Sequence, residues 1–299
     1  MHAYKQHMTG VLFSIIWSSA FIAGKVAIQD IDPIGTLFLR FLCCSLLLAP
    51  FCLRTGGRLT LAGLIGAGGV LGFLNNAVYL GLTFSALQYI SPEWVIIIVS
   101  CSPFMTMALS VLRGNERFSM TKLAGLVIGF TGVIIMTGVT GLDNNAVAGL
   151  GMALGGTFAF SVGTVLFREK GKELPLGAVN FWMSLSAVIL LAPWAVHRGL
   201  PLESVTLPGF AAIGWLVAVS LLGMALWLLL IRRYGAVTAA SYHLLNPVSG
   251  LLLAFLVLGT PPNAHNSIGA ATICLGLYIV SRGKKDATVP KAKKREQTS

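Results

Sequence analysis

The sequence predicts an all-α membrane protein with ten transmembrane helices arranged as two inverted five-helix repeats. Three observations lead to this fold class: an apolar composition, a one-sided distribution of basic residues, and an internal repeat with an odd number of helices. Of the 299 residues, 56% are hydrophobic and only 10% are charged, whereas soluble domains carry about 25% charged residues. Ten apolar runs have about the length of a bilayer-spanning helix, roughly 20 residues. Their connections are too short to hold a soluble domain.

The ten expected helices follow one another through short connections rich in Gly, Pro, Asp and Asn. They comprise residues 8–28, 33–53, 61–83, 92–112, 120–138, 146–167, 176–196, 210–231, 237–258 and 266–281. The first run is of full spanning length and nine similar runs follow it, so we expect a membrane helix there rather than a cleaved signal peptide.

Counting Lys and Arg in the connections predicts the orientation, because positively charged loops stay on the cytoplasmic side. With a cytoplasmic N-terminus, eleven Lys and Arg outside the C-terminal tail lie on the cytoplasmic side, and Arg198 alone lies on the other. The eleven are Lys5, Arg54, Arg58, Arg113, Arg117, Lys122, Arg168, Lys170, Lys172, Arg232 and Arg233. We therefore expect both termini to be cytoplasmic, with the basic tail 284–299 lying on anionic lipid.

The two halves of the chain repeat a spaced pattern of Gly, Pro and Phe. The matching pairs are Pro103 with Pro247, Gly125 with Gly269, and Gly132 with Gly276 at a shift of 144 residues, and Phe21 with Phe160 and Gly24 with Gly163 at a shift of 139. Five helices per copy is an odd number, so the second copy is expected to be inverted relative to the first, as in many transporters. The predicted domains are a first repeat at 1–140 and a second at 141–283. Chance matching among the many glycines is the alternative explanation.

The first helix of each predicted repeat carries hydroxyl and aromatic side chains on one face. In the first repeat these are Ser14, Trp17, Ser18, Phe21 and Lys25, and in the second they are Thr157, Phe160, Ser161 and Thr164. Matching faces of this kind suit a cavity shared by the two repeats. The alternative is ordinary helix packing, in which Ser and Thr form contacts between helices.

Further polar and aromatic side chains lie in the third, fourth and eighth helices. They are Asn75, Asn76 and Tyr79, then Trp94, Ile98 and Ser102, and finally Trp227. Two adjacent amides in lipid both need partners, so at least one is expected to meet water, substrate or another helix. Trp94 and Trp227 lie near helix ends and are alternatively interfacial belt residues.

The ninth helix holds the most informative group, in which Tyr242, His243 and Asn246 share a stripe followed by Pro247. His243 is the only histidine within an apolar run, and its side chain can exchange a proton in the physiological range. The alternative is a core histidine with a structural hydrogen bond. Proline removes a backbone hydrogen bond, so Pro247 and its repeat partner Pro103 predict hinges or unwound segments.

The remaining charged residues of the apolar runs lie toward the side opposite the N-terminus. Lys25 and Arg40 are inside predicted helices, and Asp30, Asp32 and Glu93 face the same side. A charge in a membrane helix is a functional candidate by default. We expect Arg40 and these acids to form an ion-pair network that serves either as a gate or as static architecture.

Several segments resemble the EamA-type half of the drug/metabolite transporter superfamily. They are Trp17 to Phe21 (WSSAF), Pro33 to Phe41, Ala86 to Tyr89 (ALQY), Ser102 with Pro103, Gly114 to Arg117 (GNER), Gly125 and Gly132, and more loosely Asn246 with Pro247 and Gly269 to Gly276. The resemblance implies an exporter of amino acids, other metabolites or drugs in the bacterial inner membrane, usually coupled to protons. The pattern is most similar to the aromatic amino-acid exporters.

The residues also argue against other classes of protein. The net charge of +11 comes from loop clusters and the tail, which does not indicate nucleic-acid binding. An intramembrane enzyme, such as a lipid-modifying transferase, needs a nucleophile with a base or paired carboxylates at depth, and the spans contain no deep carboxylate. The five cysteines lack metal-ligand spacing, so no metal or cofactor is expected.

The expected function is export of a small molecule by alternating access, with amino acids, and aromatic ones in particular, as the first hypothesis. A multidrug or organic-cation exporter of the same family is the alternative. Proton coupling and facilitated diffusion are both compatible with the sequence.

Overall fold

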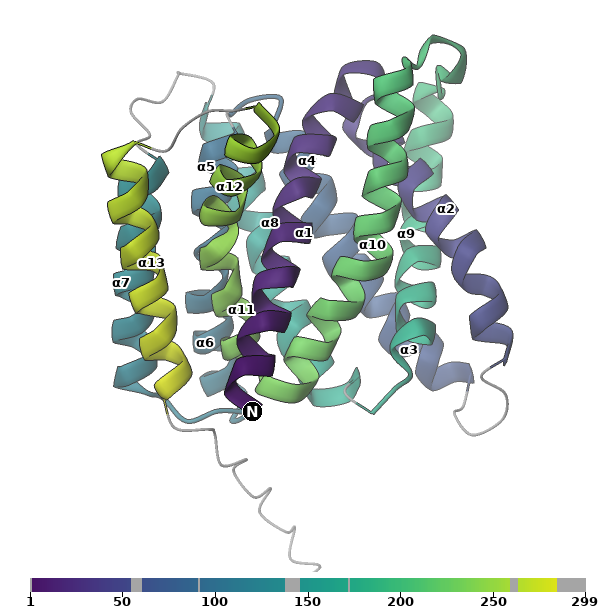
Figure 1. The fold of residues 1–299 in the computed structure, drawn as a ribbon. Coiled ribbons are helices and arrows are strands. Elements are labelled where there is room, and N and C mark those ends of the chain that lie inside the picture. The colour runs from purple at the N-terminus through teal and green to yellow at the C-terminus, as the bar shows by residue number, and fades with distance from the viewer. Residues whose placement is uncertain are drawn as a thin grey trace, which may run out of the picture.

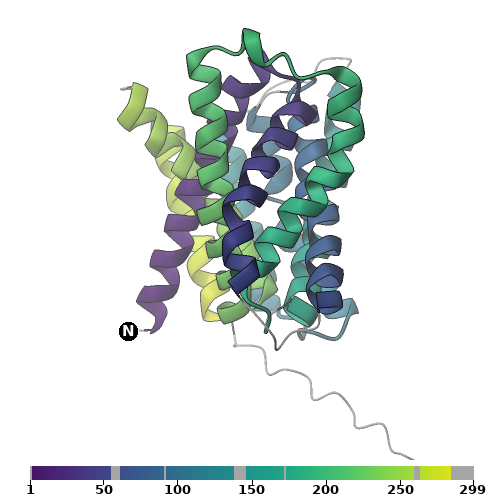
Figure 2. The ribbon, with the colours of Figure 1, turned by 90° about the vertical axis from the view of Figure 1, so that its right-hand side faces the viewer.

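The computed structural model describes residues 2–54, 61–90, 92–137, 146–171, 173–258 and 263–283, and nearly all of these residues are helical. The helices run steeply between two ends of one bundle, and the N-terminus lies at one of these ends (Figure 1). The connection between α9 and α10 covers the opposite end (Figure 2). No strand occurs within the described ranges, as the all-α prediction requires.

The helices divide between the two repeats. The first repeat contains α1 (His2–Asp30), α2 (Pro33–Arg54), α3 (Leu61–Leu71), η1 (Gly72–Tyr79), α4 (Leu80–Ala86), α5 (Pro92–Val99), α6 (Ser102–Leu112) and α7 (Met120–Thr137). The second contains α8 (Ala146–Leu166), η2 (Phe167–Gly171), α9 (Leu176–Arg198), η3 (Leu202–Ser204), α10 (Leu207–Tyr234), α11 (Ala236–Ser241), η4 (Tyr242–Leu245), α12 (Asn246–Leu258) and α13 (Ala264–Arg282).

Nine helical stretches among the described residues are long and apolar enough to cross a bilayer. The ninth predicted helix, 237–258, is not one of them, and the structure divides it into α11, the 3-10 turn η4 and α12. The fourth predicted helix is divided in the same way into α5 and α6. Both divisions fall directly before the prolines of the repeat, Pro103 and Pro247, as their missing N–H groups predict.

The packing of the helices reflects the repeat. Helix α1 packs on α10 and α12, and its counterpart α8 packs on η1, α4, α5 and α6. The pairs α2 with α9 and α7 with α13 each join equivalent helices of the two repeats. These contacts are preserved when the repeats are exchanged, as expected for two inverted copies that pack across a shared axis. The core of the bundle therefore lies between the repeats.

Glycines allow α7 and α13 to approach closely at one edge of the bundle (Figure 1). A Cβ atom on Gly276 would lie 2.4 Å from the backbone nitrogen of Gly129, and one on Gly132 would lie 2.7 Å from that of Ile273. In contrast, a Cβ atom on Gly151 of α8 would meet no atom within 4 Å. The Gly-x-x-x-Gly spacing therefore marks a helix contact at Gly125 and Gly129 but not at Gly151.

The α7–α13 contact predicts a difference between two glycine substitutions. Gly276→Ala should destabilise the protein by about 1–3 kcal/mol, because the methyl group forces two backbones apart. Gly151→Ala should leave stability unchanged or raise it slightly, because alanine is the better helix former by about 1 kcal/mol. Thermal unfolding of the two variants in detergent measures the difference, and equal melting temperatures would contradict the close approach.

Candidate functional site

Four aromatic side chains surround the imidazole of His243 in the interior of the bundle. The ring centroids lie 5.3 Å from Phe13, 5.7 Å from Trp17, 5.2 Å from Phe160 and 5.0 Å from Trp227. The rings come from α1, α8 and α10, while His243 belongs to η4. We call these five side chains the aromatic cluster. Both repeats contribute to it, so its shape depends on how the repeats are placed.

Trp227 stacks between two phenylalanines of the aromatic cluster. Its ring lies 5.2 Å from Phe13 with an interplanar angle of 25°, and 5.1 Å from Phe160 with an angle of 22°. Tyr79 continues the contact, with its ring 4.5 Å from that of Phe160. The indole nitrogen of Trp227 is buried without a hydrogen-bond partner. The stack therefore offers flat apolar surface together with an unused donor.

A hydrogen-bond network fixes one nitrogen of His243. Its Nδ1 lies 3.2 Å from Nδ2 of Asn246, and the Oδ1 of Asn246 accepts from Ser14 Oγ at 3.2 Å. An amide nitrogen can only donate, so Nδ1 accepts and the neutral ring carries its proton on Nε2. Nε2 is buried and has no partner. His243 therefore has a structural bond, as one interpretation of the sequence requires, and also a second nitrogen that is unused.

Two hydroxyl groups bind the backbone where the divided helices resume. Ser18 Oγ of α1 donates to the carbonyl oxygen of Asn246 at 3.1 Å. Ser161 Oγ of α8 donates to that of Ser102 at 3.3 Å. Each bond joins the first helix of one repeat to the pre-proline residue of the other. The two interruptions are thus held by the same type of bond between the repeats.

Buried amides also lie between the repeats without partners. Both side-chain polar atoms of Asn75 and the Oδ1 of Asn76 lack a hydrogen bond. Asn75 faces Gly163 of α8 closely, because a Cβ atom there would lie 2.1 Å from its Oδ1. Buried polar groups in proteins are almost always hydrogen-bonded. These amide atoms are therefore unused hydrogen-bonding groups in the interior of the bundle.

Arg40 of α2 is buried, with an exposed fraction of 3%. Its Nε donates to Ser220 Oγ of α10, and its Nη1 has no partner. The guanidinium carbon lies 5.4 Å from the Phe41 ring centroid. The electrostatic neighbours of the guanidinium are Cys44 and Tyr79. The predicted pairing of Arg40 with Asp30 and Asp32 is therefore absent from the described side chains.

The two aspartates have other partners, which explains this correction. Asp30 accepts from the backbone nitrogen of Thr206 at 2.9 Å and from its hydroxyl at 2.6 Å, and so supports the start of α10. Asp32 accepts from the nitrogen of Ile34 at 3.0 Å, at the start of α2. Carboxylates are stabilised at helix N-termini by the free N–H groups. The side chain of Glu93 lies outside the described residues, and Lys25 is exposed.

The other expected site residues are partly brought together. Four of them are buried: Phe21, Ile98, Ser102 and Thr164. The hydroxyl of Tyr242 forms a hydrogen bond with His7 Nδ1 at 3.1 Å. Trp94 is half-buried and lies outside the aromatic cluster. The prediction of the site omitted Phe13 and Asn180. Phe13 lies one turn before Trp17, and Asn180 lies 140 residues after Arg40, within the range of the repeat shifts. These two spacings were available signals.

Ionic contacts join the repeats at the end of the bundle that holds the N-terminus. Glu116 Oε2 lies 3.2 Å from Lys122 Nζ, and both side chains are buried. Glu116 Oε1 accepts from the nitrogen of Val237 at 3.4 Å, which anchors the start of α11. Nearer the surface, Arg113 and Glu169 form a two-bond pair at 2.9 and 2.7 Å. This end is therefore closed by contacts between the repeats.

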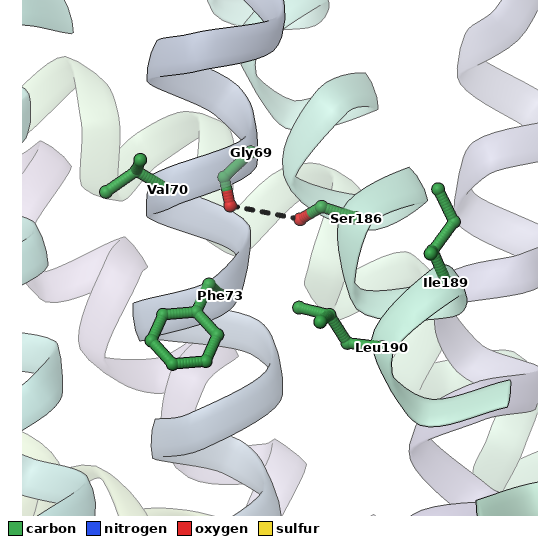
Figure 3. Close-up of a pocket in the computed structure, with 6 residues that line it drawn as sticks. All are labelled: Gly69, Val70, Phe73, Ser186, Ile189 and Leu190. Atoms are coloured by element: carbon green, nitrogen blue, oxygen red, sulfur yellow. Dashed lines mark hydrogen bonds between the residues drawn. The ribbon is translucent and has the colours of Figure 1, made fainter. Parts of the chain in front are cut away.

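An apolar groove of about 400 Å³ lies on the outside of the bundle between α3, η1 and α9 (Figure 3). It is lined by Gly69, Val70, Phe73, Ser186, Ile189 and Leu190. The large side chains in it are exposed, and its one hydroxyl, Ser186 Oγ, donates to the Gly69 carbonyl oxygen at 3.3 Å. Such a surface suits lipid chains. The buried polar groups described above do not line it.

The geometry defines a class of protein. Inverted repeats, helices divided near the centre and buried polar groups between the repeats are typical of secondary transporters. The chain belongs to the EamA-like transporter family, whose model matches residues 5–138 and again 147–282. The match in both halves agrees with the inferred two-repeat fold. The protein is accordingly a membrane transporter and not an enzyme.

Similar proteins agree with this assignment. A "Probable amino-acid metabolite efflux pump" of Salmonella typhimurium is 27% identical over 288 residues, covering 92% of this chain and 94% of that protein. The "Uncharacterized inner membrane transporter YedA" of Escherichia coli K12 is 27% identical over 282 residues, covering 92% and 90%. A solved structure titled "Crystal structure of protein" superposes with a TM-score of 0.76 at 19% identity, covering 93% of this chain and 98% of that one, and shows the same fold.

The buried pair at Glu116 predicts a large stability effect. Glu116→Gln should cost about 3–5 kcal/mol, because it removes the charge that compensates buried Lys122. Adding Lys122→Met should recover much of that loss. The control, Glu169→Gln in the half-exposed pair with Arg113, should cost about 1 kcal/mol or less. Thermal unfolding compares the variants, and equal losses for Glu116→Gln and Glu169→Gln would contradict the structural role.

Proposed function

We propose that this protein exports amino acids, with aromatic amino acids preferred, across the inner membrane by alternating access between its two repeats. The observation that carries the proposal is the aromatic cluster around His243, which both repeats build. The efflux-pump name of a relative that matches almost the whole chain supports amino acids as the substrate class.

The aromatic cluster suits a ring-bearing substrate. Aromatic pairs gain about 0.5–1.5 kcal/mol beyond the burial of their area, and Trp227 already stacks with Phe13 and Phe160. A substrate ring that enters between these side chains replaces one stacking contact with another. The unused polar atoms of Asn75, Trp227 and His243 are then available to the polar groups of the substrate.

Movement of one repeat against the other would open the site. At the junctions of α5 with α6 and of α11 with α12, the α-helical hydrogen bonds change to i→i−3 bonds, so these junctions are the natural hinges. Opening the end that holds the N-terminus requires breaking the contacts of Glu116 and Glu169 between the repeats. Substrate would enter from this end, which the basic loops place in the cytoplasm.

His243 is the candidate for coupling transport to protons. Its Nε2 has no partner among the surrounding rings, and water would reach it once the repeats separate. A charged imidazole would be costly in the closed cluster. Protonation would therefore favour an open state, and deprotonation would favour closure.

Organic-cation export is the competing function, and the same rings favour it. Cations bind over the faces of Trp, Tyr and Phe, and five such side chains, including Tyr79, meet around or next to His243. The transport assay below includes this class of substrate.

The proposed orientation predicts the behaviour of reporter fusions. Green fluorescent protein fused after Ser299 should fluoresce, because the C-terminus is cytoplasmic. Alkaline phosphatase fused at the same position should be inactive, and should become active when fused after Glu203 in the opposite loop. The reverse pattern of activities would overturn the orientation.

Reconstituted protein in liposomes tests the substrate. We expect uptake of radiolabelled phenylalanine and tryptophan in preference to alanine and to an organic cation, and an increase when a pH gradient is imposed. Trp227→Ala should lower aromatic uptake about tenfold or more through lost stacking. The matched control is Trp194→Ala, since Trp194 is about half exposed.

The outcomes separate the parts of the proposal. Preferred uptake of the cation would overturn amino-acid export. If the uptake of aromatic amino acids is the same with and without a pH gradient, and the same in the His243→Ala variant, only the role of His243 in proton coupling would be overturned.

A further inference from the structure

Arg40 is a buried cation without an acidic partner among the described residues. The ion pairs found among the described residues are Arg113 with Glu169 and Lys122 with Glu116. Both lie at the end of the bundle that holds the N-terminus. Asp30 and Asp32 are occupied at helix starts. An arginine at the centre of a membrane helix costs about 2.5–3.5 kcal/mol on insertion scales. Here one neutral hydroxyl, Ser220 Oγ, bonds it.

The surroundings of Arg40 are built from both repeats. Asn180, 140 residues after Arg40 and on the equivalent helix α9, donates to the Ser220 carbonyl oxygen at 3.1 Å. The side chains of Arg40 and Asn180 thus converge on the same residue of α10. Only one of these two related positions carries a charge. The site is therefore asymmetric, with one cation that has no acidic partner among the described side chains.

Tyr79 adds a polar group to the edge of the aromatic cluster. Its ring lies 4.5 Å from Phe160, and its hydroxyl is buried without a hydrogen-bond partner. On α10, Ser220 and Trp227 are seven residues apart, which places them on one face about 10 Å from each other along the axis. The cation and the rings thus form two ends of one region, at a separation that suits a small molecule.

We infer that the Arg40 guanidinium binds the carboxylate of the transported substrate, with the apolar end of that substrate in the aromatic cluster. The free Nη1 supplies a charge-assisted hydrogen bond, and a guanidinium matches the geometry of a carboxylate. The substrate class is then an organic acid or a zwitterion with a ring or apolar group. Organic cations without a carboxylate are disfavoured by the uncompensated positive charge. The inference rests on the proposed transport site and narrows its substrate class.

Three probes with the same phenyl group test this inference. Phenylalanine carries both a carboxylate and an ammonium group, 3-phenylpropionate carries only the carboxylate, and phenethylamine carries only the ammonium. Binding to the purified full-length protein is measured by ligand-induced thermal shift, and by competition with radiolabelled phenylalanine uptake in liposomes. We expect phenylalanine and 3-phenylpropionate to bind and phenethylamine to fail.

Substitutions of Arg40 assign this selectivity to the guanidinium. Arg40→Met should weaken phenylalanine binding about ten- to a hundredfold, the value of a hydrogen bond to a charged group, and should abolish discrimination against phenethylamine. Arg40→Lys should keep the discrimination with weaker binding. Arg198→Met is the matched control, because Arg198 is exposed, and it should behave as the wild type. If Arg40→Met does not fold, the binding of the same three probes to the wild type and to Arg40→Lys is compared instead.

The results distinguish this inference from the proposed function. Equal binding of phenethylamine and phenylalanine to the wild type, or retained discrimination in Arg40→Met, would overturn the role of Arg40 and leave amino-acid export intact. If 3-phenylpropionate binds but no amino acid does, this result would support the role of Arg40 and overturn amino-acid export. Binding of phenethylamine alone would overturn both.

Discussion

The need to satisfy backbone hydrogen bonds inside a bilayer governs how this protein is built. Lipid offers no partner for a free N–H or carbonyl group, so an interrupted helix is tolerated only where protein or water surrounds it. The interruptions before Pro103 and Pro247 are buried between the repeats. There, Ser18 and Ser161 bind the adjacent carbonyls of the opposite repeat. Each half therefore supplies a hydrogen bond to the divided helix of the other.

This constraint also places the polar chemistry of the molecule. Because the divided helices face each other across the centre, η4 brings His243 into the rings of α1, α8 and α10. At the edge, α7 and α13 pack through glycines with little polar content. The bundle thus separates a tightly packed scaffold from a central region whose amides, indole and imidazole have unused hydrogen-bonding atoms.

The charged residues divide into two groups with different roles. At the end that holds the N-terminus, Glu169 pairs with Arg113 of the other repeat. Glu116 pairs with Lys122 of its own repeat and accepts a hydrogen bond from the backbone of Val237 in the other. At the centre, Arg40 has a hydroxyl instead of an acid as its bonding partner. Paired charges stabilise one arrangement of the helices, whereas an uncompensated charge remains available to a ligand. The charged residues at the two levels of the membrane therefore differ in their partners, which is the basis for the role that we propose for Arg40.

Much of this could be predicted from the sequence, because the signals are local and periodic. Apolar runs of spanning length predicted the membrane helices, the odd repeat predicted the inverted arrangement, and Pro103 and Pro247 predicted the interruptions. The stripes on individual helices singled out Trp17, Phe160, Trp227 and His243 as candidates for a shared cavity, and the structure buries all four; their role in a cavity stays a prediction. Phe13 was missed although it lies one turn before Trp17, because an apolar side chain in a membrane helix does not by itself distinguish a buried cluster from lipid contact.

Other features depended on the tertiary structure, because they concern partners far apart in the chain. The sequence placed Arg40 near Asp30 and Asp32 by depth, but packing turned Arg40 toward Ser220, while the aspartates bound helix starts. Likewise, Gly151 and Gly129 have the same Gly-x-x-x-Gly spacing, yet only Gly129 meets a backbone. Composition and periodicity determined that this chain is a ten-helix membrane protein with a polar centre. The packing of the two repeats against each other determined which polar groups are hydrogen-bonded or ion-paired, because such bonds form only between atoms that the fold brings close together.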